Sequence, residues 1–259
     1  MLAEYQTQDD FSNLPPSPLS QKTFNVRAGP QLYFHRDWVA AQQSFRRGLE
    51  LDPNSIELHN HYARCLMLFG RTEEAIAEMR RTVDLDPLSL RYKHNYGTLL
   101  FFVRQYDRAI DQLRKTLELE PNYGPAHEWL GYAYERKGME KEAVAEWVKA
   151  LKLRREDEVA ANVERAYAAS GFAAAVRAMA QRDLKDPEER TKRGECVAPS
   201  EYAYAYTRLG DKEKALAWID KAVDVRDRFA LEVKSNPIYD FLRDDQRFQA
   251  SLKRVVVVQ

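Results

Sequence analysis

The sequence predicts an all-α protein made of stacked antiparallel helix pairs, and three observations lead to this prediction. Prolines recur at a fixed interval, since Pro53, Pro87 and Pro121 lie 34 residues apart. A row of alanines keeps the same interval: Ala41, Ala75, Ala109 and Ala143. Within each interval the apolar residues follow the three-to-four spacing of an amphipathic helix and not the alternation of a strand.

Each 34-residue unit has room for two helices of about a dozen residues and a short turn. The stretch from Glu73 to Pro87 is typical of a second helix, with apolar residues on one face. Glycines stand where first helices are expected to end, a position that favours a left-handed residue: Gly70, Gly138, Gly171 and Gly210. Arg36 and Arg104 take the equivalent place in two units, so glycine is not obligatory there.

Two rows of small residues indicate where the paired helices approach closely. One is the alanine row and the other is Ala63, Gly97 and Gly131. Large aromatic residues also keep the period and are predicted to form the core: Tyr62, Tyr96, Tyr134, Tyr206, Trp147 and Trp218.

A heptad with a central proline marks the boundary between units: LELDPNS from Leu49, VDLDPLS from Val83 and LELEPNY from Leu117. Its leucines finish one helix, the proline prevents continuation, and a polar pair begins the next helix. The fourth copy reads LKLRRED, with Arg155 in the proline position. We therefore expect the geometry of the stack to change after Leu153.

The period and these rows resemble the tetratricopeptide repeat (TPR), most closely in the segment from Gly124 to Leu151. The resemblance implies an α-solenoid that winds as a right-handed superhelix, with first helices lining a concave groove. The last residues, from Ser235 to Val255, resemble the tail that closes TPR regions of multidomain bacterial signalling and transcription regulators. Its Phe241, Leu242, Phe248 and Leu252 are expected to cover the last repeat.

The chain accordingly divides into four predicted parts. Residues 1–30 are expected to be a disordered tail, and residues 31–155 a regular array with a partial first unit and three full units. Residues 156–234 are expected to hold degenerate and then recovered helix pairs, with a polar connector from Lys185 to Pro199. Residues 235–259 are expected to be the capping tail.

Composition disfavours several classes of function. The 259 residues carry 40 basic and 40 acidic side chains, which gives no support for direct nucleic-acid binding. The sequence predicts no membrane-spanning segment and no secretory signal. The two cysteines, Cys65 and Cys196, form no disulfide or metal-finger pattern. These features favour a cytoplasmic protein.

No catalytic motif is apparent, so we expect no enzyme activity, no cofactor and no metal. His59 and His61 point to opposite sides of a helix, and His59 and His127 occupy the same position two units apart. With no carboxylate at the helical spacing, they are expected to be surface or groove residues. Cys65 is expected to be a buried structural thiol.

The predicted binding site is therefore the concave groove implied by the TPR resemblance. Its candidate residues lie on three first helices: Asn60, His61, Arg64, Arg91, His94, Asn95, Thr98, Glu128, Trp129, Tyr132 and Arg136. Asparagine bonds both donors and acceptors of a peptide backbone, and arginine grips carboxylates. Ordinary solvated groove residues are the alternative.

We expect a non-catalytic scaffold or sensory module that binds a protein or peptide partner; its oligomeric state is left open. The alternative is a regulatory signalling subunit, the detached TPR half of a bacterial transcription regulator, kinase or cyclase, acting in trans. A hydrolase or metal enzyme is the third alternative. Some TPR proteins clamp acidic C-terminal tails with basic residues, which Asn60, Arg64, Arg91 and Asn95 resemble loosely. Pro125 and Trp129 depart from that clamp.

Overall fold

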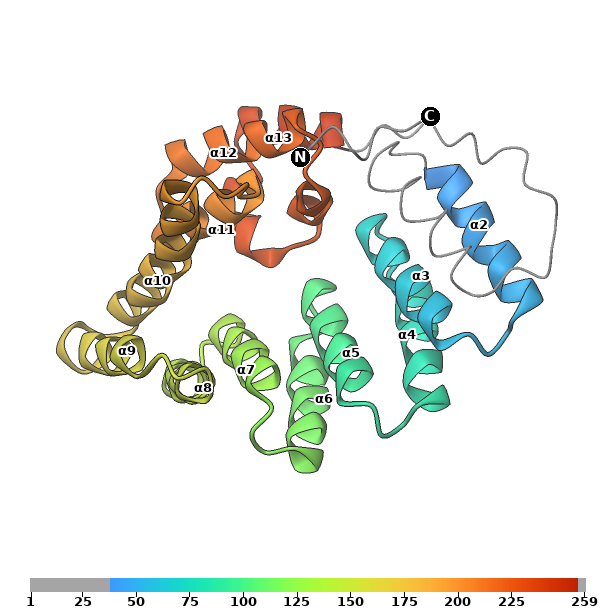
Figure 1. Cartoon of the computed structure of the whole chain (residues 1–259), viewed down its shortest axis with the longest axis horizontal. Coiled ribbons are helices and arrows are strands. Elements are labelled where there is room, and N and C mark those ends of the chain that lie inside the picture. The colour runs from blue at the N-terminus through green and yellow to red at the C-terminus, as the bar shows by residue number, and fades with distance from the viewer. Residues whose placement is uncertain (1–37, 256–259) are drawn as a thin grey trace.

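The computed structural model describes residues 38–255, which form twelve α-helices and two 3-10 helices (Figure 1). The predicted tail at residues 1–30, Arg36 and the C-terminal residues 256–259 lie outside this part of the chain. The helices of the first region are α2 (Trp38–Leu51), α3 (Ile56–Leu68), α4 (Thr72–Leu85), α5 (Leu90–Phe102), α6 (Tyr106–Leu119), α7 (Gly124–Arg136) and α8 (Glu140–Leu153). The second region holds α9 (Asp157–Ser170), α10 (Phe172–Lys192), α11 (Pro199–Leu209), α12 (Lys212–Asp224), η2 (Arg228–Lys234), η3 (Pro237–Leu242) and α13 (Gln246–Val255).

The prediction of an all-α array of antiparallel helix pairs is confirmed. Helices α3, α5 and α7 each have 13 residues, and their partners α4, α6 and α8 each have 14. The pairs follow one another around an open arc in Figure 1. The arc brings the C-terminal region back toward α3 and α5.

Close contact between paired helices depends on the predicted small residues. A Cβ placed on Gly97 would lie 2.6 Å from Cγ of Leu113, and one on Gly131 would lie 3.1 Å from the Ala143 carbonyl oxygen and overlap the Trp147 ring. Glycine therefore leaves the space that the large residue of the partner helix fills. Trp147 is fully buried as a result.

The turns within the pairs use a residue with positive φ, but Gly171 departs from the predicted left-handed helical conformation because its φ of 76° is combined with a ψ of −170°. Gly138 has φ of 70° and ends α7. Arg104 occupies the equivalent position after α5 with φ of 63°. A residue with a Cβ adopts this backbone conformation only with steric strain. This conformation sends the chain directly into the second helix of the pair.

The structure departs from the regular repeat after Leu153, as the altered fourth heptad predicts. Helix α10 has 21 residues and runs through Pro187 to Lys192. The expectation of a connector from Lys185 is therefore wrong in its first part, and only residues 193–198 lie between helices. Proline has a φ compatible with a helix, and the hydroxyl of Tyr202 donates to the Pro187 carbonyl at 2.9 Å.

The C-terminal tail covers the end of the array through most of the predicted residues. Leu242 and Phe248 are fully buried, and Leu252 packs against the core. Phe241 is a correction, because its side chain is 51% exposed. With three residues per turn in η3, Phe241 lies about 120° around the axis from the buried Leu242.

Candidate functional site

The inner side of the arc contains two adjoining cavities with volumes of about 740 and 470 Å³. Both are within the usual range of ligand sites, roughly 300–1,000 Å³. Six residues line both cavities: Arg182, Asp183, Tyr204, Phe229, Glu232 and Asn236. We call the two cavities together the chamber. Its walls are α3, α5 and α7 on one side and α10, α11 and η2 on the other.

Most of the candidate groove residues line the smaller cavity. These are Arg64, His94, Asn95, Thr98, Glu128, Trp129 and Tyr132. Trp129 packs edge-to-face against Phe101 and against Tyr132, with ring centroids 5.3 and 5.6 Å apart. The inner faces of three successive first helices therefore meet in a single concave surface.

Four candidates line neither cavity. Asn60 is 1% exposed, and its side-chain oxygen accepts a hydrogen bond of 2.9 Å from Asn95 Nδ2, so it joins α3 to α5 and does not face a partner. His61 and Arg91 lie 3.8 and 3.6 Å from the carboxylate of Glu57. Glu57 is four residues before His61, so the expectation of no carboxylate at helical spacing is wrong for this histidine. Nε of Arg136 is buried without a hydrogen-bond partner among the described residues.

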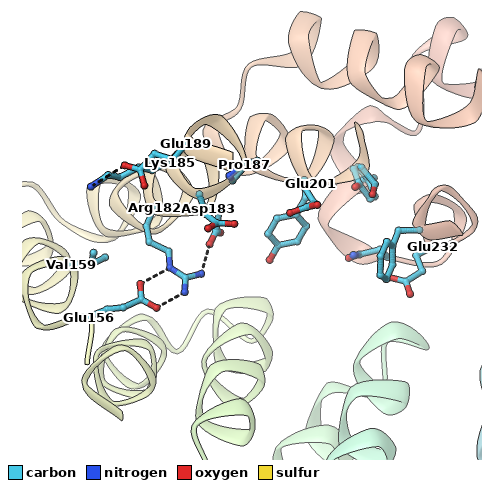
Figure 2. A pocket seen from close by; sticks show the side chains of 15 residues that line it. Glu156, Val159, Arg182, Asp183, Lys185, Pro187, Glu189, Glu201 and Glu232 are labelled. Carbon is cyan, nitrogen blue, oxygen red and sulfur yellow. Dashed lines mark hydrogen bonds and ion pairs between the residues drawn. The ribbon is translucent and has the colours of Figure 1, made fainter. Parts of the chain in front are cut away.

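Arg182 is the central cation of the chamber wall (Figure 2). Its Nε and Nη2 donate to the two oxygens of Glu156 at 2.8 and 2.5 Å, and its Nη1 donates to Oδ1 of Asp183 at 3.1 Å. This hydrogen bonding lowers the pKa of the Glu156 carboxyl. Arg182 thus joins the start of α9 to the middle of α10.

A second buried cation, Arg208, connects α11 to α7. Its Nη1 donates to Glu135 at 3.3 Å, and its guanidinium lies over the Tyr132 ring at 4.8 Å from the centroid. Coulombic attraction and ring contact of this kind hold a guanidinium that is largely removed from water.

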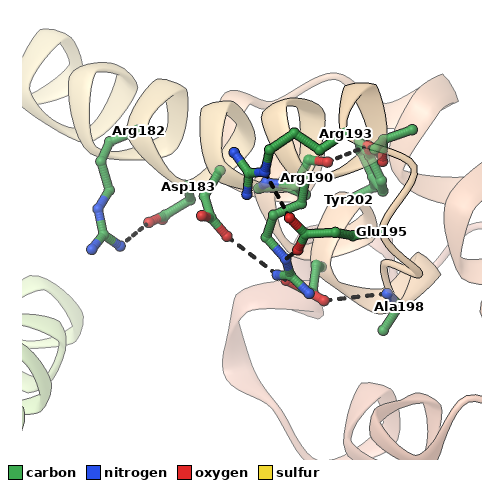
Figure 3. A network of polar contacts seen from close by, with 11 residues as sticks. Arg182, Asp183, Arg190, Arg193, Glu195, Ala198 and Tyr202 are labelled. Atoms are coloured by element: carbon green, nitrogen blue, oxygen red, sulfur yellow. Dashed lines mark hydrogen bonds and ion pairs between the residues drawn. The ribbon is translucent and has the colours of Figure 1, made fainter.

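Polar contacts also fix the end of α10 (Figure 3). Arg190 donates to Asp186 at 3.2 Å and to Glu201 at 2.6 Å, and Glu201 accepts from the backbone N–H of Ala198 at 3.2 Å. The hydroxyls of Thr191 and Tyr202 are 2.6 Å apart. These bonds hold α11 against α10, so the far wall of the chamber has a defined position.

Two ion pairs join the C-terminal segment to the first repeats. Nη2 of Arg64 on α3 lies 3.4 Å from Oε1 of Glu232 on η2. Nη2 of Arg104, after α5, lies 2.6 Å from Oδ1 of Asp240 on η3. The segment from 228 to 242 therefore faces the inner side of the array and completes the chamber.

Sequence reasoning did not identify the residues of the far wall, above all Asp183, Arg208 and Glu232. Asp183 and Glu232 lie outside the rows of the repeat, so no row marks them, whereas Arg208 precedes Gly210 by two residues as the candidate Arg136 precedes Gly138. One signal was present: Arg182 and Asp183 closely follow AAAVRAMA, a stretch that is apolar except for Arg177, which is an unusual place for adjacent opposite charges.

The histidine expectation is corrected for His59 and His127, which are buried and structural. Nδ1 of His59 lies 2.5 Å from Oε2 of Glu78, and its Nε2 lies 2.9 Å from the Pro53 carbonyl oxygen. His127 makes the same two contacts with Glu146 and the Pro121 carbonyl. The carboxylate comes from the next helix, 19 residues on, which is why a search at helical spacing misses it.

Other potential chemistry is limited in the part of the chain that the structure describes. Cys65 is buried, and burial raises the pKa of its thiol, as for a structural cysteine. Between residues 38 and 255 there is no group of three or more metal-ligating side chains. No helix there is long and apolar enough to cross a bilayer.

The fold and the chamber define a helical-repeat protein with a concave binding surface. Tetratricopeptide repeat models match residues 35–94, 97–161 and 201–228, which together cover more than half of the sequence. The chain belongs to the tetratricopeptide repeat family, whose domains generally mediate protein–protein interactions.

Solved structures that match this chain include MamA and a mutant of the Thermobaculum terrenum O-GlcNAc transferase. One MamA crystal structure is 20% identical over 82% of this chain and 96% of its own, with a TM-score of 0.45. A mutant of the transferase is 25% identical over 51% of this chain and 25% of its own, with a TM-score of 0.44. Comparison with curated proteins gives no match.

Proposed function

We propose that this protein is a non-catalytic interaction module that binds a peptide segment of a partner protein in the chamber. The single observation that carries the proposal is the convergence of inner-face residues from α3, α5 and α7 on one cavity. Hydrogen-bonding groups and aromatic rings both line this cavity, a composition that suits a peptide ligand.

The shape of the chamber favours a short segment over a folded domain. The walls are fixed by paired charges and close packing, so the surface is formed before the partner arrives. Only the ligand then loses conformational freedom on binding, which lowers the entropic cost of the complex. The C-terminal segment limits the space, so a few extended residues fit better than a whole helix.

Selection of random peptides displayed on phage tests this function directly. Wild-type protein is expected to enrich a family of related peptides. The double variant Asn95→Ala/Trp129→Ala should bind them at least about tenfold more weakly, because central aromatic and polar contacts dominate such interfaces. Lys149→Ala on the outer face of α8 is the control.

Two results would contradict the proposal. One is the absence of any enriched peptide with wild-type protein. The other is equal binding by the double variant, provided that its thermal melt shows a folded protein.

A regulatory role in trans is the second candidate. The packing of Leu242 and Phe248 against the last repeat agrees with the resemblance to the tails of bacterial signalling regulators. A two-hybrid test against winged-helix, kinase and cyclase domains of the source organism addresses it. An interaction that the Asn95→Ala/Trp129→Ala variant loses would support this role, and no interaction with any of the three classes would exclude it.

A further inference from the structure

The buried carboxylate of Asp183 has an incomplete set of partners. Its side chain is 9% exposed and lines both cavities, and only Oδ1 accepts a hydrogen bond, from Arg182. Among residues 38–255 Oδ2 has no hydrogen-bond partner. A buried carboxylate oxygen without a donor is energetically unfavourable, which makes it a candidate recognition group.

The neighbouring cations bond other carboxylates and leave Oδ2 of Asp183 without a hydrogen-bond partner. Arg182 gives two of its three hydrogen bonds in the chamber wall to Glu156. Arg208, which lines neither cavity, bonds Glu135 through Nη1 and lies over the Tyr132 ring, and its Nε and Nη2 have no hydrogen-bond partner among residues 38–255. Burial raises the pKa of Asp183 although Arg208 and Arg182 oppose this, so the attraction of the two guanidiniums does not fully compensate for lost water.

The rest of the chamber is acidic and aromatic. Seven carboxylates line the two cavities, against the three basic residues Arg64, Arg182 and Lys185. Six of the seven pair with these residues or with Arg154 and Arg190 beside the cavities, whereas Asp183 keeps one oxygen without a partner. Glu232 is largely buried as well, and burial raises its pKa. The rings of Trp129, Tyr132 and Phe229 line the smaller cavity beside these groups. Acidic groups between aromatic faces favour a cation, by ion pairing and by cation–π attraction.

We propose that the chamber binds the ammonium or guanidinium group of a lysine or arginine side chain in the partner peptide, with Asp183 as its counter-ion. This inference rests on the proposed function and specifies the chemistry of its ligand. It also predicts rejection of acidic tails, because the basic residues that line the chamber, Arg64, Arg182 and Lys185, are already paired with Glu232, Glu156 and Glu189.

The experiment uses pools of hexapeptides that share one fixed central residue and are random elsewhere. The fixed residue is lysine, arginine, norleucine or glutamate, so that norleucine keeps the apolar length of lysine without its charge. Wild-type protein should retain the lysine and arginine pools about tenfold more than the norleucine pool, and the glutamate pool least.

Asp183→Asn should lose most of this preference and still retain the norleucine pool. The matched control is Asp111→Asn on α6, which removes an exposed carboxylate outside the chamber and should keep the wild-type preference. A thermal melt of each variant checks folding, and Asp183→Glu, which keeps the charge, should recover part of the preference.

The outcomes separate the two levels of the proposal. If wild-type protein retains no pool, the peptide-binding function itself is wrong. If it retains pools without a preference for the cationic residues, or if Asp183→Asn keeps that preference, the counter-ion role is wrong while peptide binding stands.

Discussion

The two regions of the arc achieve the same kind of packing by different means. From α3 to α8 the helix lengths repeat, and glycine or alanine faces a large apolar residue in each pair. From α9 onward the helices have 14, 21, 11 and 13 residues, and arginine–carboxylate contacts connect them. Repetition thus builds the curved inner face, and individual ion pairs close it.

The largest expected effect of breaking this arrangement concerns Arg182. Arg182→Ala leaves Glu156 and Asp183 without their shared cation. The free energy of unfolding should fall by about 3 kcal/mol, the low end for a buried ion pair, because the side chains of Arg182 and Glu156 are 26% and 28% exposed. Urea unfolding followed by circular dichroism measures the loss.

A matched control lies one helix earlier. Lys152 and Glu164 join α8 to α9 through an ion pair of 3.1 Å, but their side chains are 53% and 50% exposed. Lys152→Ala should change the unfolding free energy by less than about 1 kcal/mol. Equal effects of the two substitutions would contradict a special role of Arg182.

The next effect tests the regular region. Gly131→Ala places a Cβ against Trp147, so the helices must separate, with an expected loss of about 1–3 kcal/mol. The equivalent positions in the first full unit hold Ala63 and Met79. The double variant Gly131→Ala/Trp147→Met reproduces that pair. Its loss of stability should be smaller than the sum of the losses in Gly131→Ala and Trp147→Met.

Thermal denaturation of the two single variants and the double variant gives this comparison. Strict additivity would show that the glycine and the tryptophan are independent, contrary to the packing described here.

The smallest expected effect is a pH dependence of stability that involves His59. Both ring nitrogens face acceptors, so both hydrogen bonds exist only in the imidazolium form. Burial opposes that form, but the bonds to Glu78 and the Pro53 carbonyl outweigh it and raise the pKa of His59. The stabilisation is therefore complete below the ordinary histidine pKa of about 6.5 and is lost as the pH rises through the higher folded-state value.

The middle unit supplies a control for this effect, because it holds Lys93 and Gln112 in place of the histidine and glutamate. In the wild-type protein the free energy of unfolding should fall between about pH 5.5 and pH 8.5. In His59→Lys/Glu78→Gln this fall should be smaller by about 1 kcal/mol. Melting temperatures across that range measure it. An unchanged pH profile would show that His59 does not bind its proton more tightly in the folded state.

The contrast between the regions also explains what the sequence alone predicts. Rows such as Gly97–Gly131 and the 34-residue proline spacing reveal the helix pairs, because the same packing problem is solved repeatedly. The same logic indicates which faces of α3, α5 and α7 turn inward. Whether those residues bind a partner stays a prediction.

Contacts made only once leave no such pattern. Glu232 meets Arg64 across 168 positions, and nothing in the local sequence of either residue predicts the partner. The histidine–glutamate pairs are an intermediate case, since their spacing of 19 residues occurs twice and was open to detection. The extension of α10 through Pro187 is supported by two contacts that no local pattern indicates. Tyr202, on the next helix, donates to the Pro187 carbonyl, and Arg190, one helical turn further on in α10, donates to Asp186.

The central claim is that the segment from 228 to 242 lies against the inner face of the first repeats and so encloses the chamber. Cysteine crosslinking tests it most directly, with Arg64→Cys/Glu232→Cys in a Cys196→Ser background. The remaining Cys65 is buried and should not react. A short bifunctional maleimide is predicted to give an intramolecular product with this pair, and none with Arg64→Cys/Lys149→Cys on the outer face of α8. Absence of the product from the first pair, or equal yields from both, would contradict the closed arrangement.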